Sequence, residues 1–147
     1  MGASNDTLLT GFVGGVAAWF CTELIAKPLI RFADMRRELT RCLVVYGNVP
    51  TRAQKNQAGE VSGFVELSAG EQARLSEAQK AYRDLSGRMH GFANVDHVAN
   101  WIVKAFGDDP GKAAAALLGL SNELPMSGME RAHYHDEVRN LLRIHSL

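Results

Sequence analysis

The sequence lacks an excess of charge of either sign, because its 147 residues include 16 lysines and arginines and 16 aspartates and glutamates. This balance argues against a protein that holds nucleic acid through bulk positive charge, and against a disordered, highly charged chain. Cysteine is also scarce: Cys21 and Cys42 form no CxxC pair, and neither has a second metal ligand at suitable spacing. We expect two buried free thiols in a reducing compartment and no zinc site.

Common motifs of enzyme chemistry are missing too. The chain has no Walker loop and no GxGxxG, GxSxG or HExxH sequence, so a phosphate loop, a nucleophile elbow or a zinc-protease pair is not indicated. We expect no cofactor and no metal, and the sequence leans away from an enzyme. Apolar and polar residues do not alternate with period two over a useful length, so no real sheet is expected and the predicted fold class is all-α.

One long uncharged run stands near the N-terminus, where Thr7 to Thr22 reads TLLTGFVGGVAAWFCT. The segment that continues to Ile30 is long enough to cross a bilayer as a helix. It includes Glu23 and Lys27, which are four residues apart and can pair on one helix face. No basic residue precedes it, which argues against a cleaved signal peptide. By the positive-inside rule we predict a membrane anchor over 1–30 and a cytoplasmic body over 31–147. The basic residues that follow the run are Lys27, Arg31, Arg36, Arg37 and Arg41, and they form either a solvated helix face or a contact with anionic headgroups.

Small residues recur on one face of this predicted anchor. They are spaced by four, three and four positions, so they form a stripe along the helix, and the first two make a GxxxG pair. Such a stripe permits close backbone approach between helices in lipid. We therefore expect self-association, or pairing with another membrane protein, through Gly11, Gly15, Ala18 and Thr22.

Amphipathic periodicity predicts about five further helices. Pro28 should kink or restart the first helix at the membrane surface, and residues 47–67 form the longest irregular stretch. Helix starts are indicated by capping boxes at Ser68–Glu71 and Ser127–Glu130 and by an Asp109 cap followed by Pro110. The expected architecture is one N-terminal transmembrane helix that continues into a cytoplasmic bundle of about five helices. The first bundle helix carries the apolar stripe Phe32, Met35, Leu39, Cys42, Leu43 and Tyr46.

These ordered features resemble a widespread group of small bacterial membrane-anchored helical proteins. In that group a proline follows the span, and an arginine-containing amphipathic helix, a tyrosine–x–asparagine step and a late GLSN-like turn follow in order. The resemblance implies a bacterial inner-membrane protein with a single span, and it implies no reaction. The matching residues here are Pro28, Arg36, Arg37, Tyr46, Asn48 and Gly119-Leu120-Ser121-Asn122.

Two arginine–histidine pairs are similar to the R-x4–6-H pattern of HEPN ribonucleases, which are also helical bundles. They are Arg83 with His90 and Arg139 with His145. In that family the arginine stabilises phosphate charge and the histidine acts in acid–base chemistry. A membrane-anchored CRISPR-associated family with such a domain has a similar layout.

Three functions therefore remain open at the level of sequence. The first is a membrane-anchored interaction or scaffold module whose partners are the bilayer and a second copy or another membrane protein. The second is a membrane-bound defence effector with HEPN-like ribonuclease or pore-forming activity. The third is a soluble helical subunit whose N-terminal helix is buried.

Overall fold

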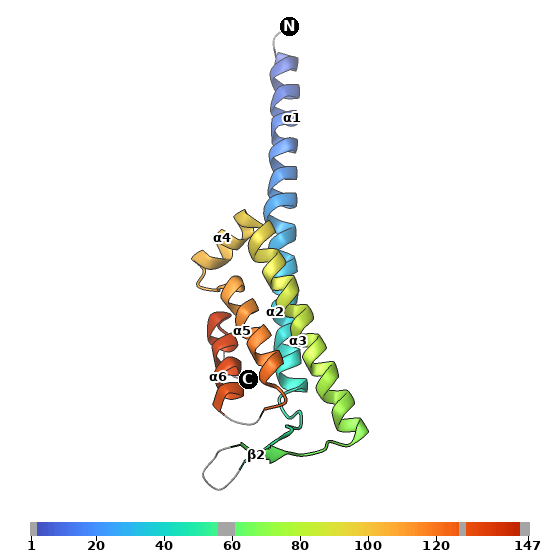
Figure 1. Ribbon diagram of the computed structural model, residues 1–147. Helices are drawn as coiled ribbons and strands as arrows, with labels where there is room; N and C mark the ends of the chain where they lie inside the picture. The colour runs from blue at the N-terminus through green and yellow to red at the C-terminus, as the bar shows by residue number, and fades with distance from the viewer. Residues whose placement is uncertain (1–2, 56–60, 127–128, 145–147) are drawn as a thin grey trace.

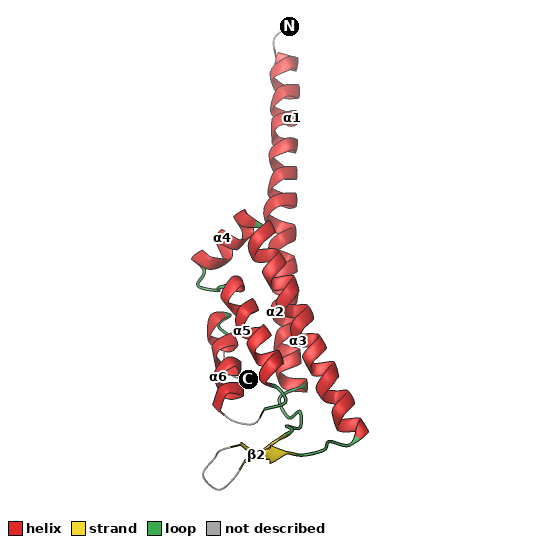
Figure 2. Ribbon diagram, in the orientation of Figure 1, coloured by secondary structure: helices red, strands yellow, loops and turns green. Residues whose placement is uncertain are grey.

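The computed structural model describes residues 3–55, 61–126 and 129–144, and within them the chain is almost entirely helical (Figures 1 and 2). The predicted all-α class is confirmed. The elements are α1 Ala3–Cys21, the π-helical turn η1 Thr22–Ala26, α2 Lys27–Val45, β1 Ala53–Lys55, β2 Val61–Phe64, α3 Ala69–Val95, α4 His97–Ala105, α5 Pro110–Glu123 and α6 Met129–Leu141. In the described residues, the body that follows α1 contains five helices, α2 to α6, as expected.

The helices α1, η1 and α2 follow one another without a break. Proline has no N–H, and its ring would clash with the carbonyl four residues earlier in an ordinary α-helix. Here the turn before Pro28 is widened, and the Lys27 N–H donates to the Thr22 carbonyl, five residues back. Pro28 was expected to kink or restart the helix, and a new α-helical element does begin at Lys27 with the proline in its first turn. The π-helical turn before it nevertheless keeps the chain helical from α1 into α2. The domain boundary predicted at residue 30 lies inside α2.

The core of the body begins one turn after Pro28. The predicted stripe is confirmed, because Phe32, Met35, Leu39 and Leu43 of α2 are buried and the Cys42 and Tyr46 side chains pack against them. These residues meet α3, and the Phe32 ring stacks on Phe92 with centroids 5.2 Å apart. Helix α5 packs between α3 and α6. The buried residues of these helices include Tyr82, Leu85, Met89, Leu117, Leu120 and Val138, and Leu142 is buried directly after α6.

Local sequence signals set the helix starts. The Ser68 capping box forms in full: the Glu71 N–H donates to Ser68 Oγ, and the Ser68 N–H donates to the Glu71 carboxylate. Asp109 caps α5 as predicted, because the Lys112 N–H donates to its carboxylate at 3.2 Å. Helix α3 runs on to Val95 past Gly87 and Gly91, near which its end was expected. The capping box predicted at Ser127 lies partly outside the described residues.

A short hairpin occupies part of the stretch that we expected to be irregular. β1 and β2 pair antiparallel, with Ala53 opposite Phe64 and Lys55 opposite Val61, and the register shifts after Gln54. The expectation of no sheet is wrong here, because strands of three and four residues are too short to give a period-two signal. The hairpin is joined to the bundle by the Arg52 N–H, which donates to the Pro125 carbonyl at 2.7 Å.

The two cysteines differ in environment. Cys21 is exposed on the last turn of α1, so the prediction that both thiols are buried is wrong for Cys21. Cys42 is half-buried on α2, and burial together with the nearby Glu38 carboxylate raises the pKa of its thiol. Burial therefore keeps the Cys42 thiol protonated and unreactive.

We predict opposite effects for two helical Gly→Ala substitutions. A methyl group at Gly119 would lie 2.6 Å from the Tyr134 ring, whereas nothing lies within 4 Å of the same position at Gly87. Gly87→Ala should raise the free energy of unfolding by about 0.5–1 kcal/mol through helix propensity. Gly119→Ala should lower it by about 1–2 kcal/mol, because overpacking exceeds that gain. Urea unfolding in detergent measures both.

The Tyr134→Ala background supplies the control for Gly119. With the ring removed, Gly119→Ala should no longer destabilise the chain. An unchanged loss of stability in that background would contradict a clash with Tyr134.

Candidate functional site

The N-terminal helix is the most unusual surface of the molecule, because it is apolar and stands apart from the body (Figure 1). Phe12 is 71% exposed and Trp19 is 58% exposed, and no residue from Thr10 to Ala26 is buried. In the part of the chain that the structure describes, one helix, Thr10–Val45, is long and apolar enough to cross a membrane. The apolar part of this helix before Lys27 is not covered by its own chain, so it requires an apolar environment from outside.

The predicted small-residue stripe lies on this exposed helix. Gly11, Gly15, Ala18 and Thr22 are all exposed, and a methyl group built at either glycine meets no atom within 4 Å. The Thr22 hydroxyl donates to the Ala18 carbonyl at 2.9 Å, so its polar group is satisfied within the helix. The stripe thus presents bare backbone along one face of α1.

The basic residues of α2 do not form one surface at the base of this helix. Arg41 lies fourteen residues after Lys27, or about 21 Å further along the helix axis. Lys27 pairs with Glu23, and Arg31 pairs with Asp96 at the start of α4 at 3.4 Å. Arg37 pairs with Asp34. Lys27 and Arg31 therefore lie nearest to α1, and the others extend down the body.

Arg36 turns into the body and joins three segments. Its Nη1 lies 3.6 Å from Asp108 Oδ2, and its Nη2 donates to the Arg143 carbonyl at 3.1 Å. The Arg143 side chain in turn donates to the Phe106 carbonyl at 2.9 Å. A cavity of about 480 Å³ opens beside this network. Its lining residues are Phe32, Ala33, Arg36, Arg37, Thr40, Val103, Phe106 and Asp108.

Asp108 is the buried acid of this network. It is 8% exposed, and its Oδ1 accepts no hydrogen bond from a described residue. Burial raises the pKa of Asp108, and the opposing effect of Arg36 and Arg143 is smaller. The folded state therefore binds this proton more tightly than the unfolded state does.

A pH dependence follows for Asp108. Because its pKa is raised in the folded state, its contribution to stability is full below the unfolded pKa and is lost as the pH rises through the folded pKa. The stability of the native chain relative to Asp108→Asn should therefore fall as the pH rises from acid values toward neutrality. Urea unfolding of both chains across that range measures the difference. Parallel pH profiles would contradict the effect of burial.

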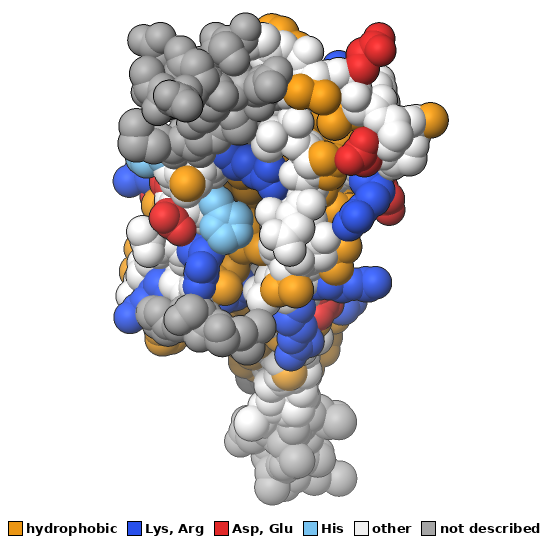
Figure 3. All heavy atoms as spheres, turned by 90° about the horizontal axis from the view of Figure 1, so that it is seen from below, with side chains coloured by type: hydrophobic (Ala, Val, Ile, Leu, Met, Phe, Trp, Pro, Cys, Tyr) orange, Lys and Arg blue, Asp and Glu red, His pale blue; other side chains and the backbone are white. Residues whose placement is uncertain are grey.

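A second cavity of about 310 Å³ lies at the end of the body away from α1. Figure 3 views this end from below and shows a histidine and basic side chains around apolar atoms. Two polar side chains that line this cavity make hydrogen bonds within the protein. Tyr82 donates to the Cys42 carbonyl at 3.2 Å, and Arg131 donates to three carbonyls. Burial raises the pKa of Tyr82, so its hydroxyl remains a donor. Nothing in the sequence singled out Arg131.

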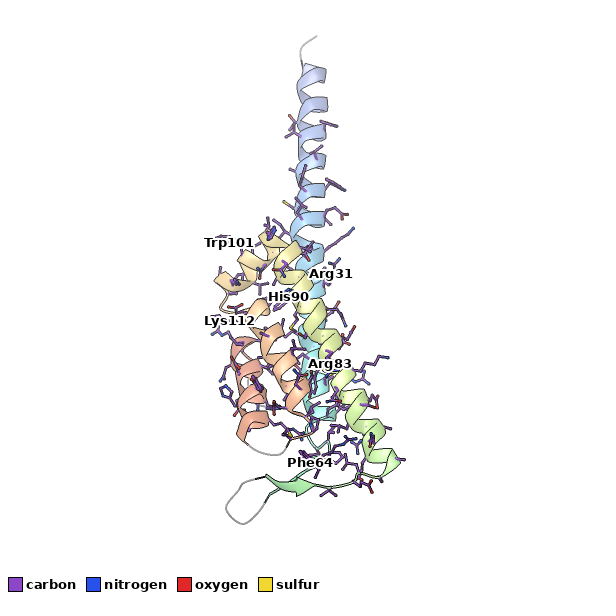
Figure 4. All side chains as sticks on the ribbon, in the orientation of Figure 1. Arg31, Phe64, Arg83, His90, Trp101 and Lys112 are labelled. Carbon is purple, nitrogen blue, oxygen red and sulfur yellow. The ribbon has the colours of Figure 1, made fainter. Side chains whose placement is uncertain are left out.

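The arginine–histidine pairs fall in different surroundings. The Arg83 guanidinium bonds to Ser121 and Asn122 of α5, at 3.3 and 3.2 Å. His90 is exposed on α3, seven residues and about 10 Å further along the helix (Figure 4). Arg83 is thus engaged in packing α3 on α5 and is not brought together with His90. Arg139 is half-buried on α6, and His145 lies outside the described residues.

No metal site is formed by the described residues. Among them, no group of three or more histidine, cysteine, aspartate or glutamate side chains converges. His133 and Glu137 approach to 3.8 Å on α6, which is a pair and not a ligand set.

The GLSN sequence, which we expected to form a turn, lies inside helix α5, and its residues have structural roles. Gly119 leaves room for the Tyr134 ring, Leu120 is buried, and Ser121 and Asn122 bind Arg83. Gln79 adds a hydrogen bond to the Ser121 carbonyl at 3.1 Å. These contacts explain why the short motif occurs where α5 crosses α3.

The chain was also compared with known proteins. It matches no protein-family model, no curated protein and no solved structure. The candidate site therefore rests on geometry and composition, which single out the exposed apolar helix α1 and the surface from which it emerges.

Proposed function

We propose that this chain is a membrane-anchored helical scaffold or interaction module. The observation that carries the proposal is the contrast along one continuous helix. From Thr10 to Ala26 it is apolar and none of its residues is buried, whereas from Lys27 to Val45 it supplies the buried stripe Phe32, Met35, Leu39 and Leu43. Such a helix presents its apolar half to lipid and folds its other half into a body.

The proposed topology follows from the charges around α1. Basic residues follow the apolar segment and none precedes it, so the body lies on the cytoplasmic side of a bacterial inner membrane. The exposed stripe that includes Gly11 and Gly15 faces a second copy of the chain or another membrane protein. Close backbone approach through glycine supports association without polar contacts.

Membrane fractionation of the expressed full-length chain tests the anchor. We expect the protein to remain in the pellet after an alkaline-carbonate wash, to require detergent for release, and to keep its full mass by mass spectrometry. A shorter, soluble chain would identify α1 as a cleaved signal sequence. A full-length soluble chain would place α1 against a protein partner instead.

Self-association is tested separately in detergent. Light scattering of the wild-type particle should give more than one copy, or reveal a second membrane protein. Gly11→Leu with Gly15→Leu should dissociate that particle, because side chains then hold the helices apart. A monodisperse single copy before substitution would remove this part of the proposal and leave the anchor intact.

A further inference from the structure

Helix α4 carries two apolar faces, and its own chain covers only one of them. Ala99 and Val103 are buried against the body. A second apolar stripe follows the i, i+3, i+4, i+7 pattern of one helix face, and most of it is open. It consists of Val98 (51% exposed), Trp101 (71% exposed), the half-buried Ile102 and the exposed Ala105.

This open face lies at the end of the body from which α1 emerges. Helix α4 contacts η1 and α2, so it stands level with the base of the apolar helix. Figure 1 shows α4 crossing that end of the body, and Figure 4 shows Trp101 on it. The Arg31–Asp96 ion pair holds the start of α4 against α2 at this level.

The charges around α4 are nearly balanced. Lys27 pairs with Glu23, and Arg31 pairs with Asp96. Lys104 lies 3.9 Å from Asp109. A surface whose cations already have partners gains little from anionic lipid, so apolar and aromatic contacts must supply the attraction.

We propose that α4 is an interfacial helix, which lies on the same membrane that α1 crosses and inserts Trp101 at the level of the headgroups. This proposal rests on the proposed anchoring of α1. If α1 crosses the bilayer, η1 enters its edge, and the neighbouring α4 is brought to the membrane surface. A tryptophan at the centre of an open apolar stripe suits that boundary, where an indole ring buries its apolar body and keeps its N–H wet. The occupant of the open stripe is therefore phospholipid.

The two tryptophans of the chain allow one test of both proposals. Trp19→Phe leaves Trp101 as the reporter of α4, and Trp101→Phe leaves Trp19 as the reporter of α1. Each full-length variant is reconstituted in phosphatidylcholine vesicles brominated at a shallow or a deep acyl position. The emission of Trp101 should shift to shorter wavelength than that of an indole in water. Shallow bromines should quench it more than deep bromines do. Trp19, about 12 Å along the helix from Lys27, should be quenched most by deep bromines.

Phe64 provides a matched control for exposure. It is 69% exposed, close to the value for Trp101, but it lies on β2 at the opposite end of the body (Figure 4). Phe64→Trp in a chain that lacks both native tryptophans should show no quenching by either lipid. The circular dichroism of every variant should match that of the wild type.

The outcomes separate the two proposals. Quenching of Trp19 without quenching of Trp101 would overturn the interfacial role of α4 and leave the anchor in place. If the emission of Trp101 were blue-shifted but not quenched by either brominated lipid, a protein partner would cover α4. That result would also overturn the interfacial role. Absence of quenching at Trp19 would overturn the anchor, and the role of α4 would fall with it.

Discussion

A chain that carries Val13→Arg and Val16→Arg is expected to leave the membrane pellet. Both valines lie on the exposed apolar half of the continuous helix. An arginine near the centre of a membrane helix costs about 2.5–3.5 kcal/mol on the insertion scale, so the pair costs about 5–7 kcal/mol. That cost removes most of the driving force for inserting a single short span. Carbonate extraction followed by flotation on a density gradient measures the change.

The same long helix offers a matched control. Val44 and Val45 are exposed at the C-terminal end of α2, where they are 67% and 49% accessible. Val44→Arg with Val45→Arg makes the same change of composition and charge in the body. This variant should stay in the pellet and float with the vesicles. If both double variants behaved alike, the apolar half of the helix would have no special relation to lipid.

Much of the body could be predicted from the sequence because its signals are local. The apolar stripe of α2 repeats at helical spacing, and burial follows that repeat directly. The Ser68 and Asp109 caps act within three residues, so they need no knowledge of the tertiary structure. The run of residues without charge also predicted a long apolar helix, whereas only the structure shows that this helix is exposed.

The hairpin and the proline turn were missed for different reasons. The strands are too short for a periodic pattern, and pairing of the hairpin is supported by a bond from Arg52 to Pro125, far along the chain. Proline generally interrupts an α-helix, but the sequence does not show whether the turn before Pro28 will widen. In the structure the π-helical turn η1 accommodates the proline, and the chain stays helical from α1 into α2.

In the candidate site, too, local features could be predicted from the sequence and long-range contacts could not. The sequence identified the small-residue stripe, and the structure places all four of its residues on the open helix. It grouped five basic residues, yet Arg36 bonds to a carbonyl 107 positions away. Periodicity on one helix cannot report such long-range partners. Periodicity cannot distinguish the open stripe of α4 from a core face, because Val98, Trp101 and Ile102 have the same spacing as buried residues.

The second large effect is expected at Arg131. Its guanidinium reaches from α6 to the end of α2 and donates to the carbonyls of Val49, Tyr46 and Gly47, at 3.0, 3.4 and 2.9 Å. These carbonyls follow the last turn of α2, near the negative end of the helix dipole. The Tyr46 carbonyl also accepts from the Val49 N–H at 3.3 Å. The side chain is half-buried, and burial lowers its pKa without discharging it. One cation thus binds three carbonyls of this turn.

Arg131→Met should lower the free energy of unfolding by about 2–4 kcal/mol, because a charged donor and several partly buried acceptors lose their partners at once. Arg131→Lys should lose less, since the ammonium keeps the charge but cannot reach all three carbonyls. Arg139→Met on the same helix is the control, because the Arg139 side chain bonds to no described residue, and its change should stay within about 0.5 kcal/mol. Urea unfolding in detergent gives these differences, and hydrogen exchange should show protection lost first at the end of α2. Equal effects of the Arg131 and Arg139 variants would mean that the three hydrogen bonds of Arg131 contribute no measurable stability.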